Sequence, residues 1–139
     1  MDKESKRYAG KYNRLMPMKT SVNTFITTYI LHMLDKRGSM YGKAMIDEMT
    51  KRFKGSWTPS HGLVYPILSE LEQEGILKGR WITGETKRQV KEYSLTKRGQ
   101  SVFELEKRES EQAFIESITM MELFMLDVYD TESMDFTTN

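Results

Sequence analysis

Apolar residues recur every three or four positions through the first half of the chain, which is the period of an α-helix with one buried face. Three such stretches follow one another after Ser21, and they end at Gly38, Gly55 and Gly75. Glycine readily adopts the left-handed backbone conformation that ends many helices. The sequence therefore predicts three consecutive helices. The first carries its apolar residues on one face: Val22, Phe25, Ile26, Tyr29, Ile30, Met33 and Leu34.

The second and third predicted helices are separated only by a short connection. The second is predicted to begin after Ser39, and Tyr41 is the first of its large apolar residues, which are spaced four positions apart. The third is predicted to begin at Ser60, because serine favours the N-cap position. Pro66 lies inside this helix, where a proline costs about 3 kcal/mol unless it lies in the first turns. We therefore expect a local distortion at Pro66 but no break.

After Gly75 the period of the apolar residues changes from that of a helix to that of a strand. Two alternating runs, residues 77–83 and 89–95, flank a segment with the composition of a turn, residues 84–87. This arrangement predicts a β-hairpin. Trp81 and Tyr93 are expected to pack across the hairpin or between the hairpin and a helix.

A long final helix is predicted from Thr96 to about Tyr129, and its two halves differ in character. Residues 104–112 are almost wholly charged, whereas apolar residues return afterwards with alternating spacings of four and three. That spacing is typical of a seam between two helices. The seam consists of Phe114, Ile118, Met121, Met125 and Val128.

Together these elements predict a mainly α fold with a small antiparallel β-hairpin. Three helices followed by a hairpin are typical of a winged helix-turn-helix domain, in which the hairpin is the wing. We place this DNA-binding domain over residues 21–99 and the long C-terminal helix with a frayed tail over residues 100–139. Residues 1–20 are polar and basic, and they fit either a short amphipathic helix or a basic arm.

Charge is distributed unevenly along the 139 residues, although the formal net charge is only +1. Residues 1–95 carry +7 and residues 96–139 carry −6. A positive front half favours a polyanionic partner such as nucleic acid, and the acidic final segment favours a different task. Composition alone leaves open the alternative that long solvated helices simply carry many charged residues.

Several classes of function are disfavoured by residues that the sequence lacks. The absence of cysteine excludes a thiol nucleophile and a cysteine-containing zinc site, and the two histidines, His32 and His61, are far apart. The chain has no glycine-rich phosphate loop and no metalloprotease or serine-hydrolase motif. We therefore expect no enzyme, no catalytic residues, no cofactor and no metal ion. No apolar run is long enough to cross a membrane, and we expect a cytoplasmic, nucleoid-associated protein.

The start of the third helix is the best candidate for contact with DNA. The N-terminus of a helix favours an anion such as a phosphate. Ser60 could cap the helix and also donate to a phosphate, whereas His61 and Tyr65 share a face with Ser69, opposite to the apolar residues, that could contact base edges in the major groove. The alternative is that His61 and Tyr65 are ordinary surface residues of an amphipathic helix.

Residues 63–77 and the predicted wing resemble one known family. The run LVYPILSELEQEGIL at 63–77 is similar to the LYPxLxxLExxGLI pattern of the recognition helix in PadR-type bacterial regulators. The wing and its exit are also similar, with GETKR at 84–88, KEYSLT at 91–96 and Gly99. The pair Tyr41-Gly42 matches the start of the family's second helix only in part.

The resemblance implies a homodimeric repressor that binds double-stranded operator DNA. It implies a dimer interface between C-terminal helices, which is consistent with the seam, and in some members a small aromatic or drug-like effector that releases DNA. We expect Ser60, His61, Tyr65 and Ser69 to face the major groove. Tyr41 and Lys43 would lie near phosphates, and Lys87 and Arg88 would act from the wing. An interaction or architectural module without specific operator binding remains the alternative, and a small-molecule-binding enzyme accessory is a third.

Overall fold

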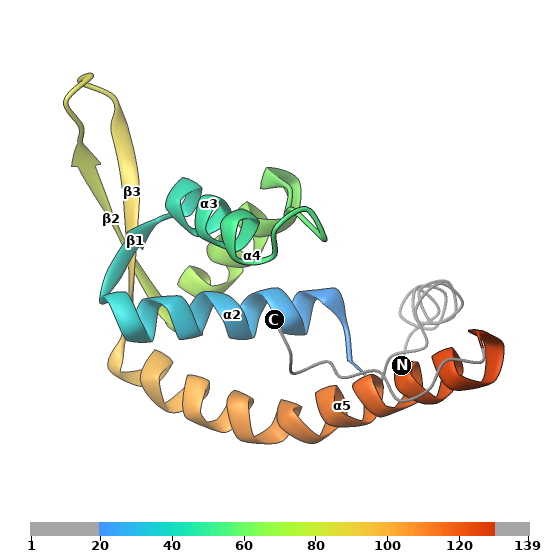
Figure 1. The fold of residues 1–139 in the computed structure, drawn as a ribbon. Coiled ribbons are helices and arrows are strands. Elements are labelled where there is room, and N and C mark those ends of the chain that lie inside the picture. Colours follow the sequence, from blue (N-terminus) through green and yellow to red (C-terminus); the bar gives the residue numbers. More distant parts are fainter. Residues whose placement is uncertain (1–19, 130–139) are drawn as a thin grey trace, which may run out of the picture. The chain divides into compact units, whose positions relative to one another are not determined.

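The computed structural model describes residues 20–129, which form four helices and one small antiparallel sheet (Figure 1). The predicted mainly α fold with an antiparallel hairpin is confirmed. The predicted N-terminal arm, except for Thr20, and the predicted frayed end at residues 130–139 lie outside the described residues. The elements are, in order, α2 (Val22–Arg37), β1 (Ser39–Tyr41), α3 (Gly42–Arg52), α4 (His61–Gln73), β2 (Leu77–Thr83), β3 (Gln89–Leu95) and α5 (Lys97–Tyr129).

The glycines predicted to end the first three helices have the expected backbone conformation. Gly38, Gly55 and Gly75 all have positive φ angles, of 85°, 70° and 75°. The Gly38 N–H donates to the Leu34 carbonyl at 2.8 Å, which closes the last turn of α2. Helix α4 continues through Pro66 without a break, as predicted.

The predicted start of the second helix is wrong by a few residues, because Ser39–Tyr41 form the short strand β1. β1 pairs with β3, so the strand order in the sheet is β1-β3-β2. Met40 is buried opposite Tyr93, whereas Ser39 and Tyr41 are exposed, as the alternation of a strand requires. This segment pairs with β3 instead of extending α3, because the strand conformation buries Met40.

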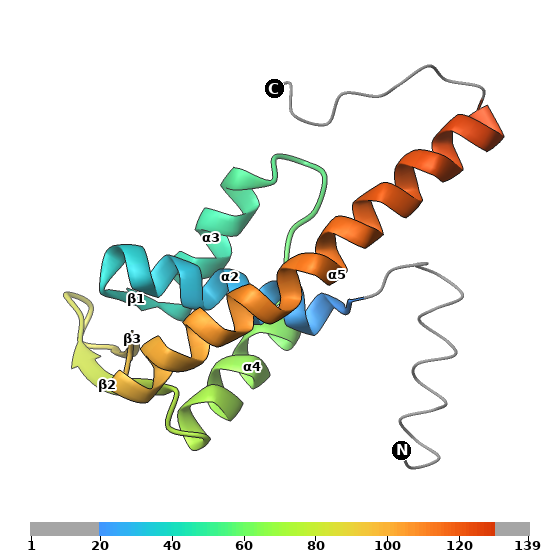
Figure 2. The same cartoon turned by 90° about the horizontal axis from the view of Figure 1, so that it is seen from below.

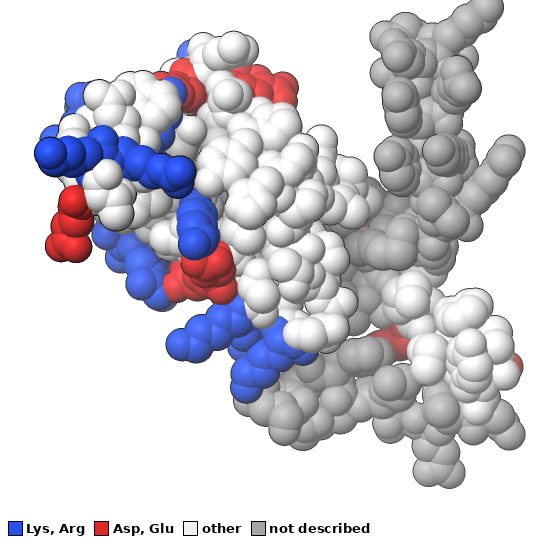
Figure 3. Space-filling view, turned by 90° about the horizontal axis from the view of Figure 1, so that it is seen from above, with Lys and Arg blue, Asp and Glu red and all other residues white. Residues whose placement is uncertain are grey.

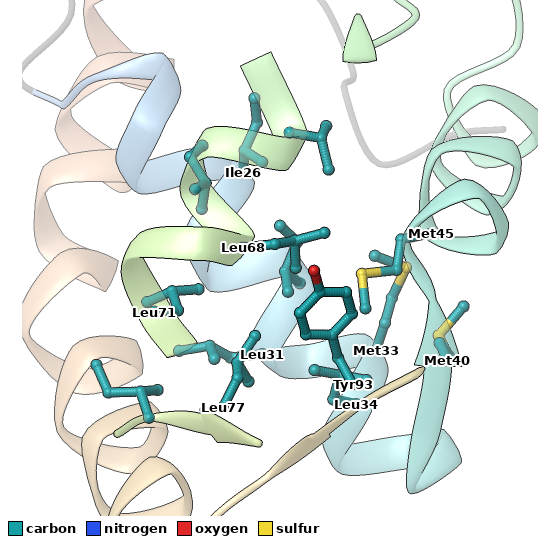
Figure 4. Close-up of a cluster of buried hydrophobic side chains, with 14 of the residues drawn as sticks. Ile26, Leu31, Met33, Leu34, Met40, Met45, Leu68, Leu71, Leu77 and Tyr93 are labelled. Carbon is teal, nitrogen blue, oxygen red and sulfur yellow. The ribbon is translucent and has the colours of Figure 1, made fainter. Parts of the chain in front are cut away.

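The core lies between the helices and one face of the sheet, and Tyr93 of β3 projects into its centre, close to Leu68 and Met33 (Figure 4). The buried apolar residues come from every element: Ile26, Ile30, Leu31, Met33, Leu34, Met40, Met45, Ile46, Met49, Val64, Ile67, Leu68, Leu71, Ile76, Leu77, Tyr93 and Phe103. Leu31 was not part of the predicted stripe on α2. Its burial shows that α2 packs on a second side.

That second side faces the first turns of α5, which run alongside α2 (Figures 1 and 2). Asp35, one turn after Leu31 on the same face, accepts a hydrogen bond of 2.9 Å from the Gln100 side-chain amide. Thr96 precedes α5 and caps it as predicted, because its hydroxyl oxygen accepts a hydrogen bond of 2.9 Å from the Gly99 N–H.

Residues 22–107 form one compact unit, called here the winged-helix unit, and the remaining described residues belong to a second one that contains α5 from Arg108 onward. Within residues 20–129, every helix is too short or too polar to cross a lipid bilayer.

Candidate nucleic-acid interface

Helix α4 is held against the start of α3 by a close contact at a glycine. Gly42 is buried, and a Cβ atom at this position would lie only 2.8 Å from Cε1 of the Tyr65 ring. Any larger residue would push the ring away. Because Gly42 has no side chain, one side of the Tyr65 ring packs on α3, while 39% of Tyr65 remains exposed.

The outer face of α4 presents the predicted DNA-contacting side chains to solvent. Ser60, His61, Tyr65 and Ser69 are all exposed, and the rings of His61 and Tyr65 are stacked, with centroids 5.6 Å apart and planes inclined by 9°. Both rings therefore form a flat, amphipathic surface one helical turn long. The opposite face of α4 is buried through Val64, Ile67, Leu68 and Leu71.

The first turn of α4 is open to an approaching partner. Ser60 occupies the N-cap position with an extended backbone, and its hydroxyl makes no capping hydrogen bond to the helix. A Cβ atom at Gly62 would meet nothing within 4 Å, so packing within the protein does not require a glycine at this position. Close approach of a ligand to the backbone is one reason for a glycine where the protein itself leaves room.

The tip of the β2–β3 hairpin carries two cations in a tight turn. The Gly84 N–H donates to the Arg88 carbonyl at 2.8 Å, and the Lys87 N–H donates to the Gly84 carbonyl at 3.0 Å. Lys87 has a φ angle of 61°, a left-handed conformation that costs a residue other than glycine roughly 1–2 kcal/mol. Lys87 and Arg88 are exposed, and within residues 20–129 neither forms an ion pair.

The remaining predicted contacts, Tyr41 and Lys43, flank the junction between β1 and α3, and both are exposed. The start of α4 and the hairpin tip both project away from α2, on the upper side of the winged-helix unit (Figure 1). Figure 3 looks down on this side and shows Lys and Arg side chains over the hairpin, with a largely uncharged surface beside them.

One connection between α4 and the hairpin was not predicted from the sequence. The Lys91 ammonium of β3 lies 2.6 Å from a carboxylate oxygen of Glu72 in α4, and 5.3 Å from the centroid of the Trp81 ring. Tyr93 is buried as predicted, but 61% of Trp81 is exposed, so its ring is not part of the core. Burial raises the pKa of Tyr93, partly offset by the nearby Lys91 ammonium.

The apolar seam of α5 lies in the second unit. Phe114 and Met125 are half-buried, whereas Ile118, Met121 and Val128 are exposed. Further exposed apolar residues lie in the same part of α5: Ile115, Leu123, Phe124, Leu126 and Tyr129. A helix that is apolar on several sides is usually buried against a partner.

Three helices and a three-stranded sheet whose last two strands form a projecting hairpin define a winged helix-turn-helix protein. The chain belongs to the PadR-like family of transcriptional regulators, whose family model matches residues 30–105. The resemblance noted in residues 63–77 and in the wing is therefore confirmed, and the chain is a winged-helix DNA-binding regulator by family. Within residues 20–129, no group of three or more His, Asp or Glu side chains could hold a metal ion.

Solved structures share this fold. PadR of Bacillus subtilis in complex with operator DNA is 28% identical to the chain, with a TM-score of 0.52 over 58% of the chain and 45% of PadR. A PadR family transcription regulator from Clostridium difficile is 23% identical, with a TM-score of 0.53 over 71% of the chain and 98% of that protein. The circadian clock associated protein Pex from Anabaena is 24% identical, with a TM-score of 0.57 over 86% and 99%. Comparison with curated proteins gave no match.

Proposed function

We propose that the chain is a homodimeric repressor that binds operator DNA in a sequence-specific manner and is released by a small aromatic or drug-like molecule. The observation that carries the proposal is the exposed, stacked His61–Tyr65 surface of α4, in the same compact unit as a hairpin tip with two exposed cations, Lys87 and Arg88. One surface suits base edges and the other suits phosphates.

On this proposal the exposed residues divide into two groups. His61, Tyr65 and Ser69 contact base edges in the major groove, because they line the outward face of the helix that a helix-turn-helix inserts there. The other residues position the protein on the phosphate backbone or in the minor groove: Tyr41, Lys43, Ser60, Lys87 and Arg88. The operator complex of PadR from Bacillus subtilis supports DNA as the partner of this fold.

The homodimer is supported by the exposed apolar residues of α5. Ile118, Met121 and Val128 would be costly to leave in water, and their heptad spacing suits a second copy of the same helix. A dimer would hold two copies of α4 on one DNA duplex, and its two-fold symmetry predicts a palindromic operator. Release by an effector rests on the family resemblance alone.

The proposal is tested by measuring binding to DNA from upstream of the chain's own gene and to scrambled DNA of the same composition, over a range of salt concentrations. We expect preference for the upstream fragment and a linear fall of log affinity with log salt, by roughly 0.9 for each phosphate neutralised. Equal, salt-independent binding to both fragments would support the interaction-module alternative. Adding a panel of aromatic compounds to the same complex tests release.

A further inference from the structure

An ion pair joins α4 to the hairpin. The Lys91 ammonium and the Glu72 carboxylate approach to 2.6 Å, and both side chains are about one quarter to one third exposed, at 26% and 30%. An ion pair that is partly shielded from water is stronger than a fully exposed one. The pKa of Lys91 is raised because its ammonium donates a hydrogen bond to the Glu72 carboxylate, an effect that outweighs partial burial.

Gly79 of β2 provides the space in which this pair forms. A Cβ atom at Gly79 would lie 2.7 Å from Oε2 of Glu72 and even closer to Cε of Lys91. The lysine stem and the carboxylate therefore cross the surface of β2 where a side chain would otherwise stand. Gly79 does not have a positive φ angle, so close approach, and not backbone conformation, is what requires a glycine here.

The ammonium also lies close to two aromatic rings of the hairpin. Its nitrogen lies 5.3 Å from the centroid of Trp81, its direct partner across the hairpin, and 5.8 Å from that of Tyr93. Such distances allow a cation–π attraction to both rings. Lys91 thus has a carboxylate on α4 and two rings on the hairpin, which restricts its position from several directions.

The position of this contact connects the two parts of the proposed DNA surface. Glu72 follows Ser69 by three residues and Tyr65 by seven, so it lies on the same side of α4. Lys91 follows Arg88 by three residues on the strand that leaves the hairpin tip. β1 pairs only with residues 92–94 of β3, so from Lys91 to the tip the hairpin is two-stranded. A two-stranded hairpin is only marginally stable by itself, so a contact at Lys91 helps to fix its direction.

We propose that Glu72, Lys91 and Gly79 form a clamp that sets the direction of the wing relative to α4, so that the wing cations and the α4 side chains engage one DNA site together. The clamp residues are positioning residues for sequence-specific binding, and this inference rests on the proposed function.

A charge argument separates the clamp from a simple electrostatic effect. Glu72 is an acidic residue close to the proposed DNA surface, so electrostatics alone predicts that its neutralisation strengthens binding to any DNA. The clamp predicts the opposite for operator DNA, because a misdirected wing can no longer contact the site that α4 selects. The sign of the effect therefore distinguishes the two explanations.

The hairpin offers a matched control on its other face. Glu92 is adjacent to Lys91 in β3 and forms an ion pair of 3.1 Å with Arg80 of β2, its direct cross-strand partner. Neighbouring residues of a strand point to opposite faces, so this pair does not reach α4. Like Glu72→Gln, Glu92→Gln removes one negative charge and one ion pair to the hairpin. It leaves the contact between Glu72 and Lys91 intact.

The experiment compares Glu72→Gln, Glu92→Gln and Gly79→Ala in the full chain, by affinity for the upstream fragment and for scrambled DNA. We expect Glu72→Gln and Gly79→Ala to lose roughly fivefold to thirtyfold in affinity for the upstream fragment, with no loss on scrambled DNA. Glu92→Gln should bind both at least as well as the parent. Gly79→Ala changes no charge of its own, but its slope of log affinity against log salt on the upstream fragment should be smaller than the parent's, because the misdirected wing cations no longer contact phosphates there.

Two further measurements keep the outcome decisive. Hydrogen exchange of the amides of residues 89–95 should be faster in Glu72→Gln than in Glu92→Gln, while both variants melt within a few degrees of the parent. The exchanged pair Glu72→Lys with Lys91→Glu should recover most of the lost affinity. If Glu72→Gln binds the upstream fragment as tightly as the parent does, the clamp is wrong. If the parent itself shows no preference for that fragment, the proposed function fails instead.

Discussion

The winged-helix unit and the part of α5 beyond Arg108 differ in how far their apolar side chains are buried. In the winged-helix unit, large apolar side chains from every element meet in one core, and α4 and the wing expose cationic and aromatic side chains, such as Lys87, Arg88 and Tyr65. Beyond Arg108, α5 exposes aliphatic side chains, such as Ile118 and Val128 of the seam. The first pattern suits a unit that folds by itself and binds a polar ligand.

The second pattern suits a helix that is completed by a partner of the same apolar character. An isolated helix gains little from propensity alone, and most helical stability in proteins comes from packing an apolar face. The acidic charge of residues 96–139 also makes DNA an unfavourable partner for this part of the chain. The two regions therefore predict two different partners, nucleic acid for one and a second helix for the other.

The largest expected effect comes from making the seam of α5 polar. Ile118→Glu combined with Met121→Glu places two charges at positions where two helices would meet, and the proposed dimer should dissociate. Operator affinity should then fall by about 10²-fold or more, because two half-sites are no longer bound by one linked molecule. Solution mass by light scattering and operator binding measure the two consequences.

Leu123→Glu is the matched control for this variant. Leu123 is at least as exposed as Ile118, at 55% against 53%, but it lies about half a turn away from the seam. We expect this variant to remain dimeric. Dissociation by Leu123→Glu, or a dimer that survives both seam substitutions, would contradict the heptad seam as the interface.

A second, smaller effect tests whether the winged-helix unit depends on its own core. A Cβ atom at Gly99 would clash with the Ile76 carbonyl oxygen and lie 3.2 Å from Cδ2 of Leu95. Because a backbone atom cannot move aside cheaply, Gly99→Ala should destabilise the unit by about 1–3 kcal/mol. Urea unfolding measures this loss. Gly62→Ala is the control, since a Cβ atom there meets nothing and should not destabilise α4.

Most of the fold could be predicted from the sequence because its signals are local. The conformational preference of glycine predicts where three helices end, at Gly38, Gly55 and Gly75. The hairpin strands and the start of α5 follow from the periodicity of the apolar residues. The strand β1 could not be predicted, because three residues show no periodicity and their pairing with β3 is a long-range contact.

The candidate site was less accessible to sequence reasoning. Exposure of His61 and Tyr65 follows from their position opposite the apolar face of α4. The contact of Glu72 with Lys91 links residues far apart in sequence, and nothing local distinguishes Glu72 from Glu70 or Glu74. The only sequence signal for it is Gly79, an unexplained glycine within an alternating strand, which is a known sign of close approach.

Tyr65 tests whether aromatic exposure in the winged-helix unit serves base contact. Tyr65→Ala should cost about 1–3 kcal/mol of binding free energy on operator DNA and little on scrambled DNA, because it removes a contact to base edges. The ring also covers Gly42, so thermal melting must be measured beside binding. If the variant melts as the parent does and binds both kinds of DNA as the parent does, α4 does not read bases through this residue.

The smallest expected effect, at Lys87, separates stability from binding in a single substitution. Lys87 has a left-handed conformation that suits glycine, so Lys87→Gly should leave the free energy of unfolding unchanged or raise it by up to about 1 kcal/mol. The same change removes a cation from the wing tip. It should weaken binding to operator and scrambled DNA alike and lower the slope of log affinity against log salt by about one unit.

Lys54→Gly is the control, since Lys54 also has a positive φ angle, 26°, but follows α3 and lies outside the wing. If Lys87→Gly is more stable than the parent and binds DNA with an unchanged salt slope, Lys87 at the wing tip does not contact phosphates. The exposed face of α4 would then be the part of the winged-helix unit that binds DNA.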